Sequence, residues 1–538
     1  MKHKIIQEID NCVNSIYKGI NDIKISIEKP KNKDHGDLST NIALLLTKKI
    51  KKNPLEICDE LKNELIKSDL FESIEIAKPG FINFKLAISS LTESLNKIIE
   101  LNNNYGQNKS GQSKKVLVEF VSANPTGPLT VGHGRGAIIG DVVSNILIWN
   151  GYKVDREYYY NNAGRQMRIL GESLKARYYE LLNKNYDFPD DGYKGDYIKD
   201  IANSLVKEHN DNLLNESDDF FKNNAEKYIF NQIKNTLSKI GLKFNNYFNE
   251  KILYDNKKIF DVVRKLKDKK LIYEKENATW FKATDIGMDS DRVLIKSTGE
   301  PTYRLPDMAY HVTKFERGYD LCVDVFGADH MDAYPDVLAA IGQLGFNKEN
   351  VKVIIHQFIS ILEDDEIVKM STRKGNFITL EKLIDDVGVD VVRYFFIMRS
   401  INSHLNFDLK LAKEKSDKNP IFYIQYAHAR ISTILNQNNN IENPDLSLLN
   451  HEQEIKLIYL LIEFEDLILK LSTNLEPQLL ANYLFNLATK FHKYYSTCRI
   501  INDDNYELTK SRLYLIKAIK ITLSNGLDIL GISSPERM

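Results

Sequence analysis

The feature that most constrains the fold is a strand–helix–strand pattern in the first third of the chain. Lys115–Val121 (KVLVEFV) is a short apolar run of β-rich composition, which is typical of a buried strand. A helical pattern follows over residues 136–150 and ends at Gly151, a C-terminal cap, and Val154–Tyr160 is a second strand. Such a unit requires two parallel strands joined by a right-handed crossover. We therefore predict a parallel sheet covered by helices.

The predicted sheet is interrupted and then resumes. Residues from about 165 to 290 are charged and mostly helical, which indicates an insertion. Leu321–Phe326 is the next strand, Tyr334–Leu344 the next helix, and Val351–Gln357 a further strand. The sheet is thus expected to be built from two halves that are distant in sequence.

Smaller domains are expected on both sides of this core. The first 110 residues contain helix-like and strand-like segments: Leu38–Ile50, Pro54–Leu65, Phe71–Ile76 and Phe81–Leu86. The polar stretch Leu101–Lys114 is predicted to be a linker. Beyond about residue 410 strand signals vanish and apolar residues recur at helical spacing. The predicted fold is multidomain: a small α+β domain (1–110), a Rossmann-type α/β core with an insertion (111–410) and a helical bundle (411–538).

Composition excludes several classes of protein. The 73 Lys and Arg residues nearly balance 74 Asp and Glu, so a general basic coat is absent, although a local basic face is not excluded. No run of about 18 apolar residues is present, which argues against a membrane span. The four cysteines lie far apart and form no zinc-type spacing, so we expect no zinc and reduced thiols. The charged start is unlike a signal peptide, and we expect a cytoplasmic protein.

The strongest chemical signal is the segment 119–136 (EFVSANPTGPLTVGHGRG), which joins the first strand to the first helix of the core. Ligands of open α/β sheets bind at such edges, and a helix N-terminus favours phosphate. Three of its glycines, Gly132, Gly134 and Gly136, would let a base or phosphate approach the backbone, and His133 and Arg135 would add donors. The spacing is not that of a P-loop. The alternative is a tight turn that simply needs glycines.

Two signatures resemble those of a known family. Thr130–His133 (TVGH) resembles the HIGH signature of class I aminoacyl-tRNA synthetases, and the longer segment resembles that of arginyl-tRNA synthetases. Val368–Gly375 (VKMSTRKG) resembles the KMSKS loop, 236 residues downstream when Lys369 is counted from His133 (369 − 133). The resemblance extends to further segments: His35–Asn41, Lys78–Asn83, Tyr303–Asp307, Gly327–His330, Asn419–Arg430 and Leu530–Met538.

The resemblance implies an enzyme that ligates L-arginine to its tRNA with ATP, through an arginyl-adenylate. It also implies an N-terminal tRNA-binding domain, an anticodon-binding bundle, Mg²⁺ carried with ATP, no metal held by the protein alone, and a monomer. Two alternatives stay open at this point. One is a catalytically silent tRNA-binding paralogue, and the other is a class I synthetase of different specificity.

The resemblance also assigns residues. Asp307 would pair with the guanidinium of arginine, Tyr303 would close the pocket, and Glu119 would hold the polar groups of the amino acid. The implied arginine site is Glu119, Ser122, Asn124, Tyr303, Asp307 and His330. The implied ATP site is Thr130, Gly132, His133, Gly134, Lys369, Met370 and Ser371, and the catalytic set is His133, Lys369, Arg373 and Lys374. The HIGH-region motif comprises Ala123, Asn124, Pro125, Thr126, Gly127, Pro128, Leu129, Thr130, Val131, Gly132 and His133.

The signatures depart from the family pattern at two positions. Thr130 stands where HIGH begins with histidine, and Thr372 stands where KMSKS has its second lysine. Because a threonine is a neutral donor, we expect Lys369 with either Arg373 or Lys374 to supply the positive charge on the phosphates.

In the bundle, Tyr426, His428 and Arg430 are predicted to contact tRNA, because aromatic and cationic side chains stack on unpaired bases and hold phosphates. In the N-terminal domain, His35 and Asn83 are predicted to contact the elbow of the tRNA. The alternatives are that Tyr426 belongs to the core of the bundle and that His35 and Asn83 cap local turns.

Overall fold

The computed structural model describes the chain except residues 21–22, 31, 33–34, 365, 369–377 and 439–441. Its centre is a five-stranded sheet in the order β11-β10-β4-β5-β6, in which every neighbouring pair is parallel. The strands are β4 (Lys115–Glu119), β5 (Lys153–Tyr160), β6 (Asn246–Asn249), β10 (Leu321–Gly327) and β11 (Val351–His356). The predicted Rossmann-type sheet built from two halves is confirmed, with β4 and β10 at the junction.

Helices cover the sheet and extend from it. Helix α5 (Val131–Trp149) connects β4 to β5, and α11 (Arg304–Glu316) and α12 (Tyr334–Gln343) flank β10. Helices α13 (Leu380–Val387) and α14 (Val389–Ile397) pack near α5. Strands β12 (Ile359–Glu363), β13 (Glu366–Ile367) and β14 (Leu405–Asp408) form a small sheet beside them, followed by α15 (Leu409–Lys413).

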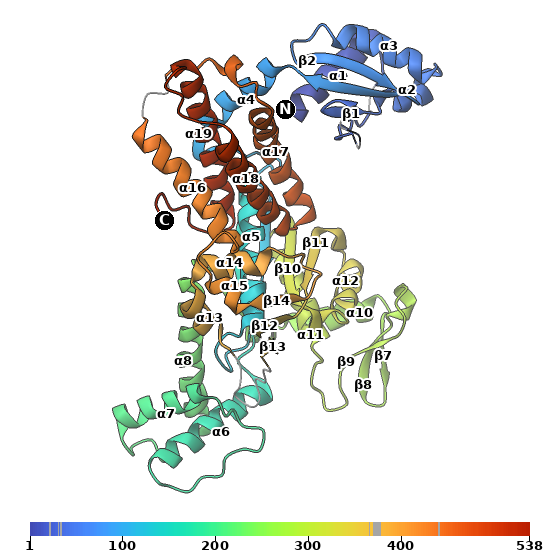
Figure 1. Ribbon diagram of the computed structural model, residues 1–538. Coiled ribbons are helices and arrows are strands. Elements are labelled where there is room, and N and C mark those ends of the chain that lie inside the picture. The colour runs from blue at the N-terminus through green and yellow to red at the C-terminus, as the bar shows by residue number, and fades with distance from the viewer. Residues whose placement is uncertain (21–22, 31, 33–34, 365, 369–377, 439–441) are drawn as a thin grey trace.

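The segment expected as one insertion has two parts separated by a strand of the central sheet. Figure 1 shows the first part as an arm of three helices: α6 (Gly164–Leu181), α7 (Asp196–His209) and α8 (Asp218–Lys239). The chain then returns as β6, which pairs with β5. The second part comprises α9 (Lys251–Asp255), α10 (Lys258–Asp268) and the antiparallel strands β7 (Ile272–Lys275), β8 (Ala278–Phe281) and β9 (Arg292–Ile295). Four residues of β6 are too few to show a strand period in a charged region.

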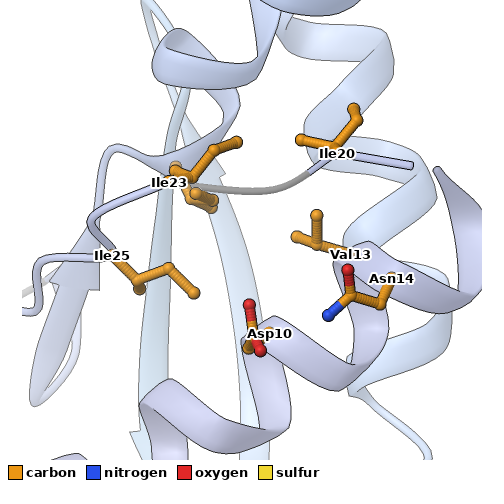
Figure 2. Close-up of a pocket in the computed structure, with 7 residues that line it drawn as sticks. Asp10, Val13, Asn14, Ile20, Ile23 and Ile25 are labelled. Carbon is orange, nitrogen blue, oxygen red and sulfur yellow. The ribbon is translucent and has the colours of Figure 1, made fainter. Parts of the chain in front are cut away.

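The N-terminal domain consists of α1 (Lys2–Ile16), β1 (Leu38–Thr40), α2 (Ile42–Ile50), α3 (Pro54–Leu65), β2 (Phe71–Ala77) and β3 (Phe81–Leu86). The expected helix from Leu38 is wrong at its start, because residues 38–40 pair with β3 instead. Figure 2 shows a hollow here lined by Ile20, Ile23, Ile25 and Asp10. Its aliphatic lining and single acidic side chain do not suit a nucleotide phosphate.

The stretch 101–114 is not a free linker. It leaves α4 (Ile88–Leu101), and Tyr105 is buried with its hydroxyl donating to the carbonyl of Leu461, 2.8 Å away. The side-chain amide of Asn525 donates to the carbonyls of Asn102 and Tyr105. The stretch was predicted to be a linker because it is polar, but it packs against the helical bundle, and Asn525 of the bundle satisfies two of its backbone carbonyls.

The C-terminal bundle comprises α16 (Pro420–Gln437), α17 (Glu452–Asn474), α18 (Gln478–Thr497) and α19 (Tyr506–Ile529). Figure 1 shows it between the N-terminal domain and the sheet. Arg393 of α14, 1% exposed, donates to Asp141 of α5 (2.6 Å), to the carbonyl of Ile240 after α8 and to that of Leu530 after α19. One buried guanidinium therefore joins the core helix, the insertion and the bundle.

Candidate active site

Helix α5 begins five residues earlier than its sequence pattern predicts, at Val131, with Thr130 as N-cap. His133 occupies the third helical position, and its Nδ1 accepts a hydrogen bond from the backbone N–H of Thr130 at 3.1 Å. This bond leaves Nε2 to carry the proton of the neutral ring. Burial lowers the pKa of His133, so the neutral form prevails at pH 7. The structure thus gives Thr130 a capping role, for which the hydroxyl suffices.

The first three glycines of this helix, Gly132, Gly134 and Gly136, have different roles. A Cβ on Gly134 would lie 2.5 Å from Leu380, and one on Gly136 would lie 2.9 Å from Nε2 of His356. These two residues allow close packing inside the protein rather than approach of a ligand. A Cβ on Gly132, in contrast, would lie 3.6 Å from Thr130 Oγ1, an ordinary contact distance, and would otherwise point into open space.

Arg135, expected to donate to a phosphate, is fully buried instead. Its guanidinium donates to the carbonyls of Gln357, Ser400 and Ser403. These carbonyls belong to loops beside β12 and β14, so Arg135 stabilises the floor of the site and does not reach its opening. Sequence position at a helix N-terminus suggested a phosphate ligand, but the side chain points into the protein.

The start of α5 is attached to the chain that follows the KMSKS-like segment. The N–H of Leu380 donates to the carbonyl of Leu129 at 2.8 Å, and Thr130 and Thr379 form an isolated bridge. Residues before this attachment that were assigned to ATP or catalysis, Lys369, Met370, Ser371, Arg373 and Lys374, lie outside the described residues. Position 372 lies there as well.

A strained turn forms the end of β4. Val121 and Ser122 have φ of 70° and 44°, values that a β-branched residue such as valine rarely adopts. The Ser122 hydroxyl donates to Oε1 of Glu119 at 2.9 Å and accepts the N–H of Tyr159. Asn124, further along the loop, accepts the N–H of Asn161. The turn therefore ties β4 to β5 at the carboxyl edge of the sheet.

Asp307 lies in the first turn of α11, beside a pocket that is also lined by His311, Asp324, Phe326 and Tyr334. Burial, aided by the neighbouring carboxylates of Glu119 and Glu250, raises the pKa of Asp307 to about 7, although His311 and Lys314 act in the opposite direction. Within the described part of the chain, no salt bridge neutralises Asp307. A cationic ligand would relieve this unfavourable environment.

Two other predicted arginine-site residues are not assembled with Asp307. The Tyr303 side chain is 86% exposed and does not close the pocket in this structure. His330 lies in the 3-10 turn Ala328–His330, and its side chain is outside the description.

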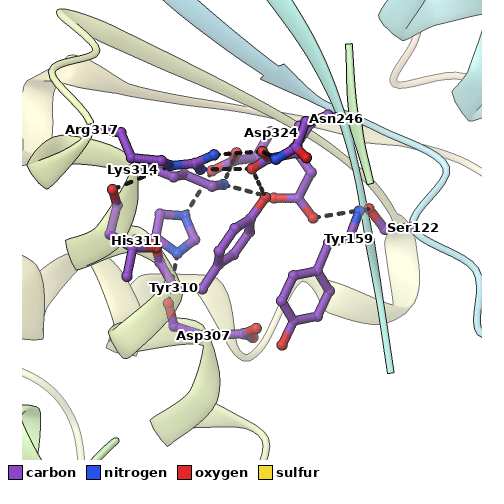
Figure 3. Close-up of polar contacts among 12 residues, drawn as sticks. Ser122, Tyr159, Asn246, Asp307, Tyr310, His311, Lys314, Arg317 and Asp324 are labelled. Atoms are coloured by element: carbon purple, nitrogen blue, oxygen red, sulfur yellow. Dashed lines mark hydrogen bonds and ion pairs between the residues drawn. The ribbon is translucent and has the colours of Figure 1, made fainter. Parts of the chain in front are cut away.

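Glu119, predicted to hold the amino acid, already has a cationic partner that the sequence did not indicate. Nζ of Lys314 lies 2.7 Å from Oε2 of Glu119 and 2.6 Å from Oδ1 of Asp324. His311 Nε2 is 2.8 Å from the other oxygen of Asp324. Figure 3 shows this cluster next to Tyr310 and Arg317. The pKa of Lys314 is raised and that of Asp324 lowered, because Coulombic attraction within the cluster outweighs burial.

Glu250 is a second acidic residue that sequence reasoning missed. Its carboxylate accepts hydrogen bonds from Tyr159 and the side chain of Asn161, both at 2.8 Å. Burial raises its pKa. Because Glu250 follows β6 and Asp307 opens α11, the sheet brings together two carboxylates separated by 57 positions (307 − 250). Residues 246–249 are too few to show a strand period, so the sequence carried no clear signal that would have found Glu250.

Comparisons with known proteins cover the whole chain. Residues 94–393 match the model of the class I (R) tRNA synthetase catalytic domain, residues 2–86 that of the arginyl-tRNA synthetase N-terminal domain, and residues 424–538 that of the DALR anticodon-binding domain. The arginine–tRNA ligase of Desulfotalea psychrophila is 46% identical over 96% of this chain and 95% of that protein. The chain belongs to the arginyl-tRNA synthetase family.

Further relatives agree with this assignment. The arginine–tRNA ligase of Salinibacter ruber is 45% identical, with all of both chains covered. The arginyl-tRNA synthetase structure from Thermus thermophilus has the same fold, with a TM-score of 0.80 at 19% identity and full coverage of both chains. The predicted family, class I enzyme type and ligation of arginine to tRNA are thereby confirmed. None of the described helices is long and apolar enough to span a membrane.

In this arginyl-tRNA synthetase the residues predicted to contact tRNA have different exposures. Tyr426 and Arg430 lie on an accessible face of α16: Tyr426 is 39% exposed and receives a 2.7 Å hydrogen bond from the Arg430 guanidinium. His428 points inward, where its ring donates to the carbonyl of Pro535, and Asn83 is 5% exposed within β3. Direct contact of His428 or Asn83 with tRNA is incompatible with this burial. His35 is exposed.

Proposed function

We propose that Asp307 and Glu250 together bind the guanidinium of arginine. The observation that carries this proposal is their shared environment: both carboxylates have raised pKa values, and none of the described cations forms a salt bridge with either. A guanidinium carries five donors in a planar fork and pairs well with two carboxylates. Glu119 is less suited to the guanidinium, because Lys314 and Ser122 already occupy its oxygens.

The remaining assigned residues of the arginine site have positioning roles in this proposal. Glu119, Ser122 and Asn124 surround the polar end of the amino acid at the edge of β4. Tyr303 covers the guanidinium after arginine enters, by a rotation that its exposure permits. His330 follows β10 at the same edge.

ATP is proposed to bind at the start of α5. Gly132 offers the open approach for a phosphate, and His133 donates from Nε2. The carboxylate of arginine attacks the α-phosphorus, its bond to phosphorus forms as the bond to pyrophosphate breaks, and arginyl-adenylate results. The protein contributes mainly positioning and charge stabilisation. In this proposal Mg²⁺ is carried by the phosphates of ATP.

Exchange of pyrophosphate into ATP tests this function directly. We expect exchange with arginine among the twenty amino acids, and the reaction should be measured with and without tRNA. Exchange with another amino acid in place of arginine would refute the assigned specificity. Size-exclusion chromatography tests the further proposal of a monomer, and cell fractionation tests the cytoplasmic location.

Substitutions in the KMSKS-like segment test the predicted ATP contacts. Lys369→Ala should lower kcat by ~10²–10³-fold, because negative charge develops on pyrophosphate as it leaves. The KM for ATP should change less. The kcat values of Arg373→Ala and Lys374→Ala should differ. One variant should lose most of its kcat and the other little, because a single cation replaces the missing lysine. Near-normal kcat in all three variants would show that this segment is not part of the ATP site.

The domain boundaries at about 110 and 410 stay part of the proposal, with tRNA bound by the N-terminal domain and the bundle. On the bundle, the guanidinium of Arg430 lies 4.5 Å from the Tyr426 ring centre and 4.6 Å from that of Tyr495. This arrangement of aromatic rings and a cation suits unpaired bases. His35 is retained as a contact from the N-terminal domain.

Arg430→Ala should raise the KM for tRNA in arginine charging by about 10-fold, within the range for loss of one stacking or phosphate contact. Arginine activation at saturating tRNA should be unchanged. Arg499→Ala is the matched control, because Arg499 is an exposed bundle arginine paired only with Asp503. An unchanged tRNA KM in Arg430→Ala would show that this face of α16 does not bind tRNA.

A further inference from the structure

The junction of the two half-sheets places two acidic side chains directly beside each other. In the pairing of β4 with β10, Asp324 is the register partner of Glu119. Partners in neighbouring strands point to the same face, where like charges repel. Both residues are at most 3% exposed, so water does not screen them. The junction would be strongly destabilised without a cation.

Lys314 supplies that cation from α11. Its side chain is completely buried, and Nζ bridges the two strands with distances of 2.7 Å to Glu119 and 2.6 Å to Asp324. The ammonium also lies 4.3 Å from the ring centre of Tyr310, and Cys322 and Asp307 are further titratable groups that interact with it. Two donors of this fully buried ammonium are thus directed at carboxylates of the protein.

Lys314 affects substrate binding through the charge balance of the paired carboxylates Glu119 and Asp324. Lys314 neutralises one of the two paired carboxylates and fixes the orientation of Glu119, whose other oxygen is held by Ser122. Asp307 is one turn before His311 and two turns before Lys314 on the same helix, and no salt bridge joins it to another residue in the described part of the chain. The helix therefore carries both the cation that satisfies the junction and the acid that faces the pocket.

We propose that Lys314 is a positioning residue for arginine binding, which keeps Glu119 aligned at the strand end by balancing the paired negative charges of Glu119 and Asp324. This inference rests on the proposed arginine site. It predicts that Lys314 matters for the amino acid and not for ATP, because Lys314 contacts Glu119, Asp324 and Tyr310, none of which belongs to the proposed ATP site at the start of α5. It also predicts that removal of Asp324, the second negative charge, compensates for loss of Lys314.

The test compares Lys314→Met with the double variant Lys314→Met/Asp324→Asn by pyrophosphate exchange. Lys314→Met should raise the KM for arginine by about 100-fold, the usual effect of removing one partner of a buried charge pair. The KM for ATP should stay within about 2-fold, since no ATP contact is lost. The double variant has the same net charge at the junction as the natural protein and should recover at least about 10-fold of the lost arginine affinity. Lys258→Met, at an exposed ion pair with Glu316 of α11, is the control.

The outcomes separate the inference from the proposed function. Absence of arginine exchange by the natural protein would refute the function itself. A folded Lys314→Met protein with a normal arginine KM, or with arginine and ATP KM values raised equally, would overturn the inference. If Lys314→Met does not fold, a folded double variant with near-normal arginine KM supports charge balance, whereas a double variant that also fails to fold shows a purely structural role and overturns it.

Discussion

Asp307→Asn is expected to raise the KM for arginine by ~10²–10³-fold, the cost of leaving a guanidinium without its buried carboxylate. The amide removes one of the two carboxylates that are proposed to bind the guanidinium, Asp307 and Glu250, and it keeps the shape of the side chain. The fold and the KM for ATP should be unchanged. Glu316→Gln is the matched control, since it removes an acid from the exposed end of the same helix. An unchanged arginine KM in Asp307→Asn would refute the assigned pocket.

Asp307 should also make the KM for arginine depend on pH. Arginine requires the ionised carboxylate, and the pKa of Asp307 in the free protein is raised to about 7 by burial. As pH falls from about 8 to about 6, protonation of Asp307 competes with arginine, so the arginine KM should rise. The rise should be much smaller in Asp307→Asn, which has no proton to gain at this position. An equal pH response in both proteins would assign the titration to another group.

His133→Ala is expected to lower kcat by ~10²–10³-fold, because it removes a preorganised donor from the developing phosphate charge. The substitution also removes Nδ1, which accepts the backbone N–H of Thr130, and this loss should lower the free energy of unfolding by about 1 kcal/mol. His133→Gln separates the two effects. Glutamine at the third helical position can accept the same N–H, so this variant should keep the melting temperature of the natural protein.

The comparison of kcat between these variants and the natural protein is made by pyrophosphate exchange at saturating arginine and ATP. A normal kcat in His133→Ala would show that the start of α5 is a structural element alone. If kcat falls in both variants only in proportion to the fall in melting temperature, the start of α5 likewise has a structural role alone.

The sequence by itself determined the class of fold and the family. Strand β4 is a short apolar run, and α16 to α19 have a helical period, so local patterns were sufficient to predict a parallel sheet and a helical bundle. The signatures around His133 and Lys369 are contiguous stretches whose identity does not depend on packing. Errors occurred where local signals were weak: three glycines concealed the first turn of α5, and four residues of β6 were too short for a period.

Only the tertiary structure decided which polar residues are available to a ligand. Arg135, His428 and Asn83 have the residue types expected of binding groups, yet packing buries each of them inside the protein. Lys314 is unremarkable in sequence, and its role arises because β10 and β4, some 200 residues apart, meet in register. Burial and charge pairing depend on contacts between distant segments, and these contacts set the free energy of every buried charge. Residue type and spacing along the chain do not contain that information.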